Sequence, residues 1–487
     1  MCLVEIDLPN DLNSLLLNSQ GEKVMKLVYG IKDKPTTGRL LVFALQQLLA
    51  ILAATIAVPA IIGHGMSQSA ALFGAGVGTL VYQLFTKFKS PVFLGSSFAF
   101  LGSMAAAFAG GVSLAVGYLG LVIGAVMAGL VYVVLAIAVK FAGVNWISKV
   151  MPSVVIGPTV TIIGLSLAGN AVGDLKKGSV LDLFGNPVCS VYVAMICGLV
   201  TLAVVVASSV YGGKMAKMIP FVIGIAAGYI VATVFTVIGN AADIDALKVI
   251  DFSKFENMKW VPEFTFLEMF GKYDFAGGNL GSYIGSIAVA YIPVAFVVFA
   301  EHLADHKNLS TIIGTDLYNE PGLARTLLGD GVGSMAGALF GGCPNTTYGE
   351  SVGCVAITGN ASVITITVTA FMAIAASFVA PFVTLLATIP SCVMGGVCIA
   401  LYGFIAVSGL KMVQTVDLGD NKNLFVVSVI LIAGVGGLSV TFGKVTLTTV
   451  ATALILGILT NLLVSIKSKK NAEPEKKEEE TEETTEE

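Results

Sequence analysis

Charged residues are scarce in this chain. Asp, Glu, Lys and Arg make up 12% of its 487 residues, and there are only 3 histidines and 2 tryptophans. A soluble globular domain carries about 25% charged residues. Here 56% of the residues are hydrophobic and the mean hydropathy is +0.89. The composition therefore excludes an ordinary soluble protein. The net charge is −4, and we expect no nucleic-acid partner.

Sequence patterns for metal binding and catalysis are also missing. The 7 cysteines are scattered without a CxxC pair, which favours buried thiols over metal ligands. His302 and His306 lie four residues apart, but Leu303 stands where a zinc protease of the HExxH type has glutamate. No phosphate-binding loop or catalytic triad is visible. We therefore expect no enzyme, no catalytic residue and no bound metal or cofactor.

Apolar stretches long enough to cross a bilayer of about 30 Å recur from Leu40 to Ile466. They predict an all-α polytopic membrane protein with about fourteen transmembrane segments. The segments are expected near residues 40–62, 70–86, 91–109, 113–140, 150–169, 188–210, 218–239, 283–304, 323–341, 343–359, 361–380, 391–413, 422–440 and 446–466. With these segments, lysines and arginines concentrate in the loops on the same side of the membrane as the N-terminus. By the positive-inside rule, both termini lie in the cytosol and the protein in the cell membrane.

The segments divide the chain into five regions. Residues 1–39 are predicted to be a cytosolic arm without a signal-peptide core, and residues 240–282 an extracellular loop. Residues 467–487 form a Glu/Thr-rich tail, predicted to be disordered. The two remaining regions, 40–239 and 283–466, would each hold seven segments.

Two pairs of sequences recur at an offset of seven segments. Pro91–Phe98 in the third segment corresponds to Pro344–Ser351 in the tenth, and Met151–Gly157 in the fifth corresponds to Ile389–Gly395 in the twelfth. A repeat with an odd number of spans must insert upside down, which predicts a 7+7 inverted repeat. Segments 3 and 10 are expected to be broken, each with a short strand that pairs antiparallel with the other. Broken segments of this kind place a binding site near the middle of the membrane.

A few acidic residues interrupt the apolar segments. Glu350 is the only Asp, Glu, Lys, Arg or His between Gly331 and Leu410, and an ionisable group in such a stretch indicates function. On a helix, Glu301 and Asp305 share one face, while His302 and His306 share a face about 100° away. The alternative is that the span ends at Ala300 and these groups lie in a cytosolic loop.

Asp330 lies between Gly329 and Gly331. The simple interpretation is a turn aspartate at a helix end.

Three runs of sequence resemble one transporter family. They are Ala300–His302, Glu320–Leu323 and Thr346–Gly359. The chain from about Leu40 to Ile466 resembles the nucleobase/ascorbate transporters, or nucleobase–cation symporter-2 family, and within it the bacterial uracil permeases. The family signature is met at Glu350, Gly353, Thr358 and Gly359.

The resemblance implies two domains with different roles. Segments 1–4 and 8–11 would form a core domain that holds the substrate, and segments 5–7 and 12–14 a gate domain that moves against it. The residues that would contact a nucleobase are Glu301, Glu350, Phe98, Gly349, Tyr348 and Tyr402. Besides the substrate and the bilayer, the resemblance implies a possible homodimer.

Four positions depart from the pattern of uracil permeases. Ser351 replaces the asparagine after the signature acid, and Gln47 stands where many relatives have histidine. Asp305 replaces a histidine and Asp330 an asparagine, and both acids resemble the purine-transporting branch. Uracil is therefore the expected base, with xanthine, urate or a wider set of bases as the alternative.

Uracil is neutral near pH 7, so its accumulation requires a coupled ion. Four acids close to one cavity (Glu301, Asp305, Asp330 and Glu350) cannot all ionise cheaply, because burial and like charge both favour the protonated form. We therefore expect H+ symport with alternating access, in which Asp305, Glu301 and Asp330 carry the proton. Na+ coupling is the alternative within this class. A channel-like facilitator is the alternative from another class.

Overall fold

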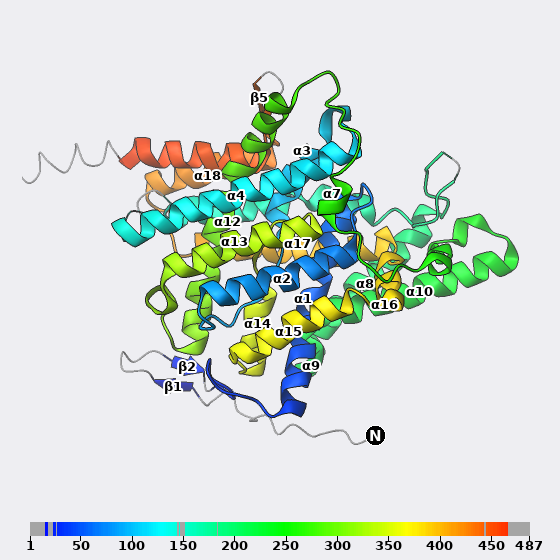
Figure 1. The fold of residues 1–487 in the computed structure, drawn as a ribbon, viewed down its shortest axis with the longest axis horizontal. Coiled ribbons are helices and arrows are strands. Elements are labelled where there is room, and N and C mark those ends of the chain that lie inside the picture. The colour runs from blue at the N-terminus through cyan, green and yellow to red at the C-terminus, as the bar shows by residue number, and fades with distance from the viewer. Residues whose placement is uncertain are drawn as a thin grey trace, which may run out of the picture.

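The computed structural model is predominantly helical (Figure 1). It describes residues 27–143, 146, 151–182, 184–442 and 445–465, and the backbone of two short strands, β1 (Leu15–Leu17) and β2 (Lys23–Met25). The predicted acidic tail at 467–487 and Cys2 lie outside the described residues. The other six cysteines are free and buried.

The helices and strands fall into three successive stretches of the chain. In the first part they are α1 (Thr37–Ile62), α2 (Gln68–Phe85), β3 (Leu94–Ser96), η1 (Phe98–Phe100), α3 (Leu101–Ala107), η2 (Ala109–Gly111), α4 (Leu114–Ala142), α6 (Ser153–Ser166), α7 (Ala168–Asp174), α8 (Val191–Tyr211), α9 (Lys214–Met218) and α10 (Pro220–Ala242). The next are η3 (Asp245–Leu247), η4 (Phe252–Asn257), α11 (Thr265–Glu268), α12 (Leu280–Ile313), η5 (Tyr318–Gly322), α13 (Leu323–Gly341), β4 (Asn345–Thr347), α14 (Gly349–Thr358), α15 (Val363–Ala376) and α16 (Ala380–Ala387). The last are α17 (Ser391–Val413), α18 (Asn421–Val435), β5 (Val440–Phe442), β6 (Val445–Leu447) and a helix over Thr449–Ser465.

Within the described residues, 7 helices are long and apolar enough to cross a membrane by themselves. They are α1, α4, the combined α6 and α7, α8, α10, α12 and α17. Helices α15 and α16 form an eighth, bent candidate with an angle of 84° between them. The prediction of a polytopic all-helical membrane protein is confirmed, while the count of fourteen segments stays a prediction.

The strands β3 and β4 cross in the interior and pair antiparallel. Leu94 lies opposite Thr347, and Ser96 lies opposite Asn345. The pairing is extended at both ends, by Ser97 N–H to Pro344 O at 2.9 Å and Tyr348 N–H to Phe93 O at 3.2 Å. Each extended segment thus satisfies the backbone groups of the other, which an isolated strand in a membrane could not do.

Glycines let α2 and α13 approach closely, as Figure 1 shows for these neighbouring helices. A Cβ atom on Gly78 would lie 2.7 Å from Gly333 O, and one on Gly333 would lie 2.7 Å from Gly78 O. Small residues at such contacts permit the backbone-to-backbone packing typical of membrane helices.

Two simpler interpretations of the acidic residues are wrong. Helix α12 continues without interruption to Ile313, well beyond the predicted end at 304, so Glu301 and Asp305 lie in a helix rather than in a loop. Asp330 lies in the middle of α13 and is 1% exposed, so it is not a turn residue. Both helices continue because their polar side chains find partners or a cavity inside the protein, as described below.

The end of the N-terminal arm is paired with the transmembrane part. Val28 N–H donates to Gly359 O at 2.8 Å, and Ala361 N–H donates to Tyr29 O at 2.8 Å. Val363 N–H donates to Ile31 O at 3.1 Å. The arm therefore runs beside the connection between α14 and α15, and the first helix begins at Thr37, inside the region predicted as arm.

Candidate substrate cavity

A cavity of about 370 Å³ lies beside the crossing strands. Its walls come from α12, α14, α1, α6, α8, α9, α10 and α17. The residues that line it are Ala50, Val160, Ser209, Lys217, Met218, Pro220, Phe221, Glu301, Ala304, Asp305, Gly349, Glu350, Gly353, Cys354, Ile357, Leu401, Phe404, Ile405, Ser408 and Met412. The predicted residues Glu301, Asp305, Gly349 and Glu350 are thus brought together in one place.

Three carboxyl groups face this cavity. Glu301 and Asp305 lie one turn apart on α12 and are half-buried, while His302 and His306 on the other face of the helix are 0% and 1% exposed. The two faces predicted from the spacing are therefore confirmed. Asp305 Oδ2 accepts a hydrogen bond from Thr347 Oγ1 at 2.8 Å, which connects the acid to the strand β4.

Glu350 lies in the first turn of α14, directly after Gly349. The helix begins there because β4 ends at Thr347 and the backbone turns from extended at Tyr348 to helical. Backbone N–H groups at a helix start have no partner within the helix and can bind a ligand. An exposed glycine at this point leaves those groups accessible from the cavity.

Asp330 lies behind α12 and does not line the cavity. His302 Nδ1 and Asp330 Oδ2 are 2.7 Å apart, and His302 Nε2 lies 3.0 Å from Thr326 Oγ1. The ring of His302 stacks on His306 at 4.0 Å, and His306 Nε2 lies 2.7 Å from the Tyr82 hydroxyl. The histidines thus belong to a buried polar cluster that is separate from the cavity.

Tyr348, predicted to contact the substrate, is buried and is not among the residues that line the cavity. Its hydroxyl donates to Ser96 O at 2.8 Å, and its ring packs on Gly95, where any side chain would collide. Tyr348 therefore holds the two crossing segments together.

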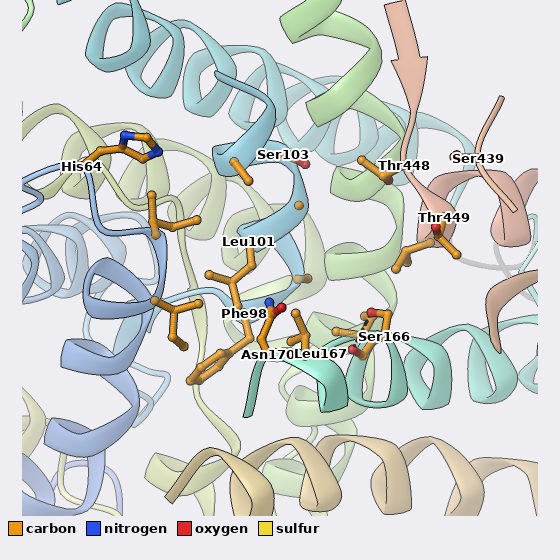
Figure 2. Close-up of a pocket in the computed structure, with 17 residues that line it drawn as sticks. His64, Phe98, Leu101, Ser103, Ser166, Leu167, Asn170, Ser439, Thr448 and Thr449 are labelled. Carbon is orange, nitrogen blue, oxygen red and sulfur yellow. Dashed lines mark hydrogen bonds between the residues drawn. The ribbon is translucent and has the colours of Figure 1, made fainter. Parts of the chain in front are cut away.

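Phe98 lines a second cavity of about 390 Å³ (Figure 2). In this view Phe98 shares the space with Asn170, Ser166 and Thr448 from other elements. The Phe98 ring meets Tyr402 edge-on at 5.6 Å between centroids. Tyr402 is 3% exposed and lies next to Leu401, which lines the first cavity. The pair thus lies between the two cavities.

Two residues of the cavity wall, and one residue that bonds a cavity acid, were missed from sequence. Phe221 on α10 and Phe404 on α17 form an aromatic pair at 5.9 Å, and Thr347 bonds Asp305. The chain has 27 phenylalanines, so two of them carry no signal by themselves. Thr347 lies in the polar run before Glu350, and this position is the signal by which the sequence could have identified it.

Apolar helices around an acidic cavity, with two short strands that pair beside it, are typical of membrane transporters. Residues 38–443 match the model of the xanthine/uracil permeases, described as a permease family. The chain belongs to this family, as its resemblance predicted.

Curated relatives match over nearly the whole chain. The uracil permease of Bacillus caldolyticus is 39% identical over 90% of this chain and 95% of its own length. The uracil permease of Bacillus subtilis is 36% identical over 92% and 98%, and that of Escherichia coli K12 is 32% identical over 90% and 94%.

Solved structures with a similar fold come from anion transporters. One is the transmembrane domain of the cyanobacterial bicarbonate transporter BicA, with a TM-score of 0.59 and 16% identity. The match covers 90% of this chain and 100% of the BicA domain. The murine anion transporter Slc26a9 in the inward-facing state covers 90%, with 69% of its own chain, a TM-score of 0.58 and 14% identity. These likenesses concern the fold alone.

Proposed function

We propose that this protein is a secondary active transporter that imports a nucleobase, uracil in the first place. The observation that carries the proposal is the placement of Glu301 and Glu350 on one cavity beside the start of α14. Carboxylates accept hydrogen bonds from the two ring N–H groups of uracil, and backbone N–H groups can donate to its carbonyls. Relatives named uracil permeases support the same substrate.

The residues that line the cavity also support the proposed division into a core domain and a gate domain. The acids come from α12 and α14, in the proposed core, while Phe221, Leu401 and Phe404 come from α10 and α17, in the proposed gate. A site between two bodies can close on one side and open on the other by their relative movement. The antiparallel pairing of β3 with β4 supports the proposed 7+7 inverted repeat of fourteen segments.

The cavity extends toward Lys217, which lies on the cytosolic side if lysines mark that side. The described conformation would then face inward, with both termini in the cytosol. The Phe98–Tyr402 pair would form part of the closed side.

The coupled ion is proposed to be H+. Glu301, Asp305 and Glu350 share one cavity, and proton binding relieves the repulsion of three carboxylates in a partly dry site. One proton that moves down 100 mV releases about 2.3 kcal/mol, enough for roughly fiftyfold accumulation.

Uptake into proteoliposomes tests the proposal. With an inside-alkaline pH gradient, labelled uracil should accumulate above its external concentration, and a protonophore should abolish the accumulation. Accumulation driven by a Na+ gradient alone would assign the other ion. Equilibration of uracil across the membrane that does not depend on any ion gradient would indicate a channel-like facilitator. Stronger uptake of xanthine than of uracil would show that xanthine, and not uracil, is the preferred substrate.

A further inference from the structure

The two oxygen atoms of the Asp305 carboxyl group have different surroundings. Oδ2 accepts the hydrogen bond from Thr347 Oγ1 at 2.8 Å, and Thr347 is the one hydrogen-bond partner of this carboxyl group among the described residues. Oδ1 lies toward Gly349, because a Cβ on that glycine would be 3.9 Å from it and would meet no other atom within 4 Å outside its own stretch of chain. Gly349 and Asp305 both line the substrate cavity. Oδ1 therefore borders open space in the cavity, whereas Oδ2 is held by the protein.

Thr347 is held in place by the crossing strands. The residue is 0% exposed and belongs to β4, where it lies opposite Leu94 of β3. A hydroxyl group has a single proton to donate, and the Thr347 hydroxyl donates it to Oδ2. When Asp305 binds a proton, that proton therefore occupies Oδ1, the oxygen that has no donor from the protein.

A proton on Oδ1 changes what Asp305 can bind. Without the proton, Oδ1 carries negative charge and only accepts hydrogen bonds, whereas Oδ1–H is a donor at the edge of the cavity. In the proposed binding mode, Glu301 and Glu350 accept the ring N–H groups of uracil, so its carbonyl oxygens require donors. A carbonyl oxygen beside Oδ1 is repelled by the carboxylate and bound by the acid.

We propose that Thr347 positions Asp305 so that its proton is held on Oδ1, where the acid donates a hydrogen bond to a carbonyl oxygen of the bound base. The inference rests on the proposed proton-coupled transport of a nucleobase. The proton enters from water on the outside, and it leaves to the cytosol after the base has dissociated. Because proton and base share this bond, each raises the affinity of the protein for the other by the same factor.

Other ionisable groups surround Asp305 and contribute to the pH dependence of binding. In the cavity they are Glu301 on the same helix, Glu350 on α14 and Lys217 on α9. Behind the cavity they are His302 and His306 on the other face of α12, Asp330 on α13, Tyr132 on α4 and Tyr82 on α2. Substitutions of Asp305 leave all of these groups in place, so they isolate the contribution of this one carboxyl group.

Binding of labelled uracil to the purified full-length protein in detergent, measured over a series of pH values, tests the bond to the base. The affinity of the wild-type protein should fall about tenfold as the pH rises and Asp305 loses its proton, the size expected for one hydrogen bond. Asp305→Asn replaces the acid by an uncharged group that keeps a donor, so this alkaline fall should disappear. An alkaline fall of equal size in Asp305→Asn overturns the proposal.

Asp305→Ala separates the donor from the charge. Both variants lack the carboxylate, but only the asparagine side chain can donate to the base. Asp305→Ala should therefore bind uracil about tenfold more weakly than Asp305→Asn. Equal affinities would show that the loss of negative charge alone favours the base, and the proposed hydrogen bond would be wrong.

The positioning role of Thr347 has its own test, in Thr347→Val. A hydrogen bond to a carboxylate favours the charged form, so without the hydroxyl Asp305 keeps its proton to a higher pH. The midpoint of the alkaline fall should rise by about one pH unit. Thr347→Ser restores the hydroxyl and should return the midpoint to the wild-type value. Thr347→Ala takes the place of the valine variant if that variant does not fold, and an unchanged midpoint overturns the positioning role.

Thr159→Val is the matched control. Thr159 is 1% exposed, and its hydroxyl donates at 2.7 Å to Val155 O in its own helix α6 rather than to a carboxyl group. Its pH curve should equal that of wild type, and a shift as large as that of Thr347→Val would overturn the specific role of Thr347. Absence of uracil binding by the wild-type protein at every pH would instead overturn the proposed function. An alkaline fall that Asp305→Asn retains overturns this inference alone.

Discussion

Gln47 on α1 donates a hydrogen bond from Nε2 to the hydroxyl of Ser351, the residue after Glu350 on α14. Ser351 Oγ also accepts from Phe93 N–H at 3.0 Å, just before the strand β3. One hydroxyl thus joins three elements beside the substrate cavity. Gln47 and Ser351 are two of the positions that the resemblance singles out as departures, and the structure places them in contact.

Ser351→Ala should weaken uracil binding through the orientation of Glu350. The change leaves Gln47 Nε2 and Phe93 N–H buried without their acceptor, a cost of about 1–3 kcal/mol that loosens the first turn of α14. We expect the KM for uracil to rise about tenfold, the equivalent of roughly 1.4 kcal/mol. Initial rates in proteoliposomes over a range of uracil concentrations measure it.

Ser408→Ala is the control, because Ser408 lines the same cavity from α17 rather than from α14. Its KM should stay within about twofold of wild type. An equal rise in both variants would show that the loss of any cavity hydroxyl weakens binding, and the positioning role of Ser351 would be wrong.

Glu350→Gln should abolish or strongly reduce uracil uptake while the protein still reaches the membrane. A carboxylate accepts two N–H groups, whereas an amide presents donors on one side that repel them. Surface labelling together with uptake separates transport from expression. Glu320→Gln, a change at the exposed ion pair with Lys89, should transport normally. Normal uptake by Glu350→Gln would exclude this acid as a substrate ligand.

The sequence identified the acids but not their division between two sites. Glu350 is identifiable because it is the only Asp, Glu, Lys, Arg or His between Gly331 and Leu410. The spacing of Glu301, His302, Asp305 and His306 predicts two helix faces. The sequence could not show that Asp330 pairs with His302 rather than with the cavity. That contact spans 28 residues and depends on how α12 and α13 both pack against α4.

The membrane fold was predictable to a similar extent. Hydropathy locates the long helices. Each satisfies its own backbone hydrogen bonds in the membrane and therefore consists of a long run of apolar residues. Hydropathy does not locate β3 and β4, which are predicted from the repeated sequences instead. Their backbone groups are satisfied by the partner strand and by side chains such as Thr79, whose Oγ1 accepts from Leu94 N–H at 2.9 Å. The pairing of the arm with Gly359 and Ala361 was also missed, since a few backbone hydrogen bonds leave no mark in composition.

Gly78→Ala should destabilise the protein. Its Cβ would meet Gly333 O at 2.7 Å, and a backbone carbonyl in a packed helix cannot move aside as a flexible side chain can. Forced overpacking costs about 1–3 kcal/mol. We expect a lower midpoint of thermal unfolding in detergent, followed by fluorescence-detected size exclusion after heating.

Gly169→Ala on α7 is the matched control for that substitution, because nothing lies within 4 Å of its added Cβ. Alanine favours a helix over glycine by up to about 1 kcal/mol, so the control should melt at the same temperature or higher. Equal melting of Gly78→Ala and Gly169→Ala would contradict the close packing of α2 on α13.

Tyr29→Ala should change transport from a position far outside the cavity. The Tyr29 ring packs edge-on against Phe43 of α1 at 6.0 Å, and its hydroxyl accepts from Arg39 at 3.2 Å. These contacts hold the arm beside Gly359, the residue that ends α14, and α14 begins with Gly349 and Glu350. Loosening the end of a ten-residue helix allows its start to shift, because a helix moves as a rigid unit.

We expect Tyr29→Ala to lower the maximal uptake rate of uracil about threefold to tenfold, a loss of roughly 1 kcal/mol. Tyr29→Phe keeps the ring contact and should retain most of the rate, which separates packing on Phe43 from the bond to Arg39. Lys32→Ala, on the same arm, tests whether any change there has this effect and should behave as wild type. If the three variants transport equally, the arm does not hold α14 in place. A loss confined to Tyr29→Ala would show that the Gly359 end of α14 and the acid at its start move together.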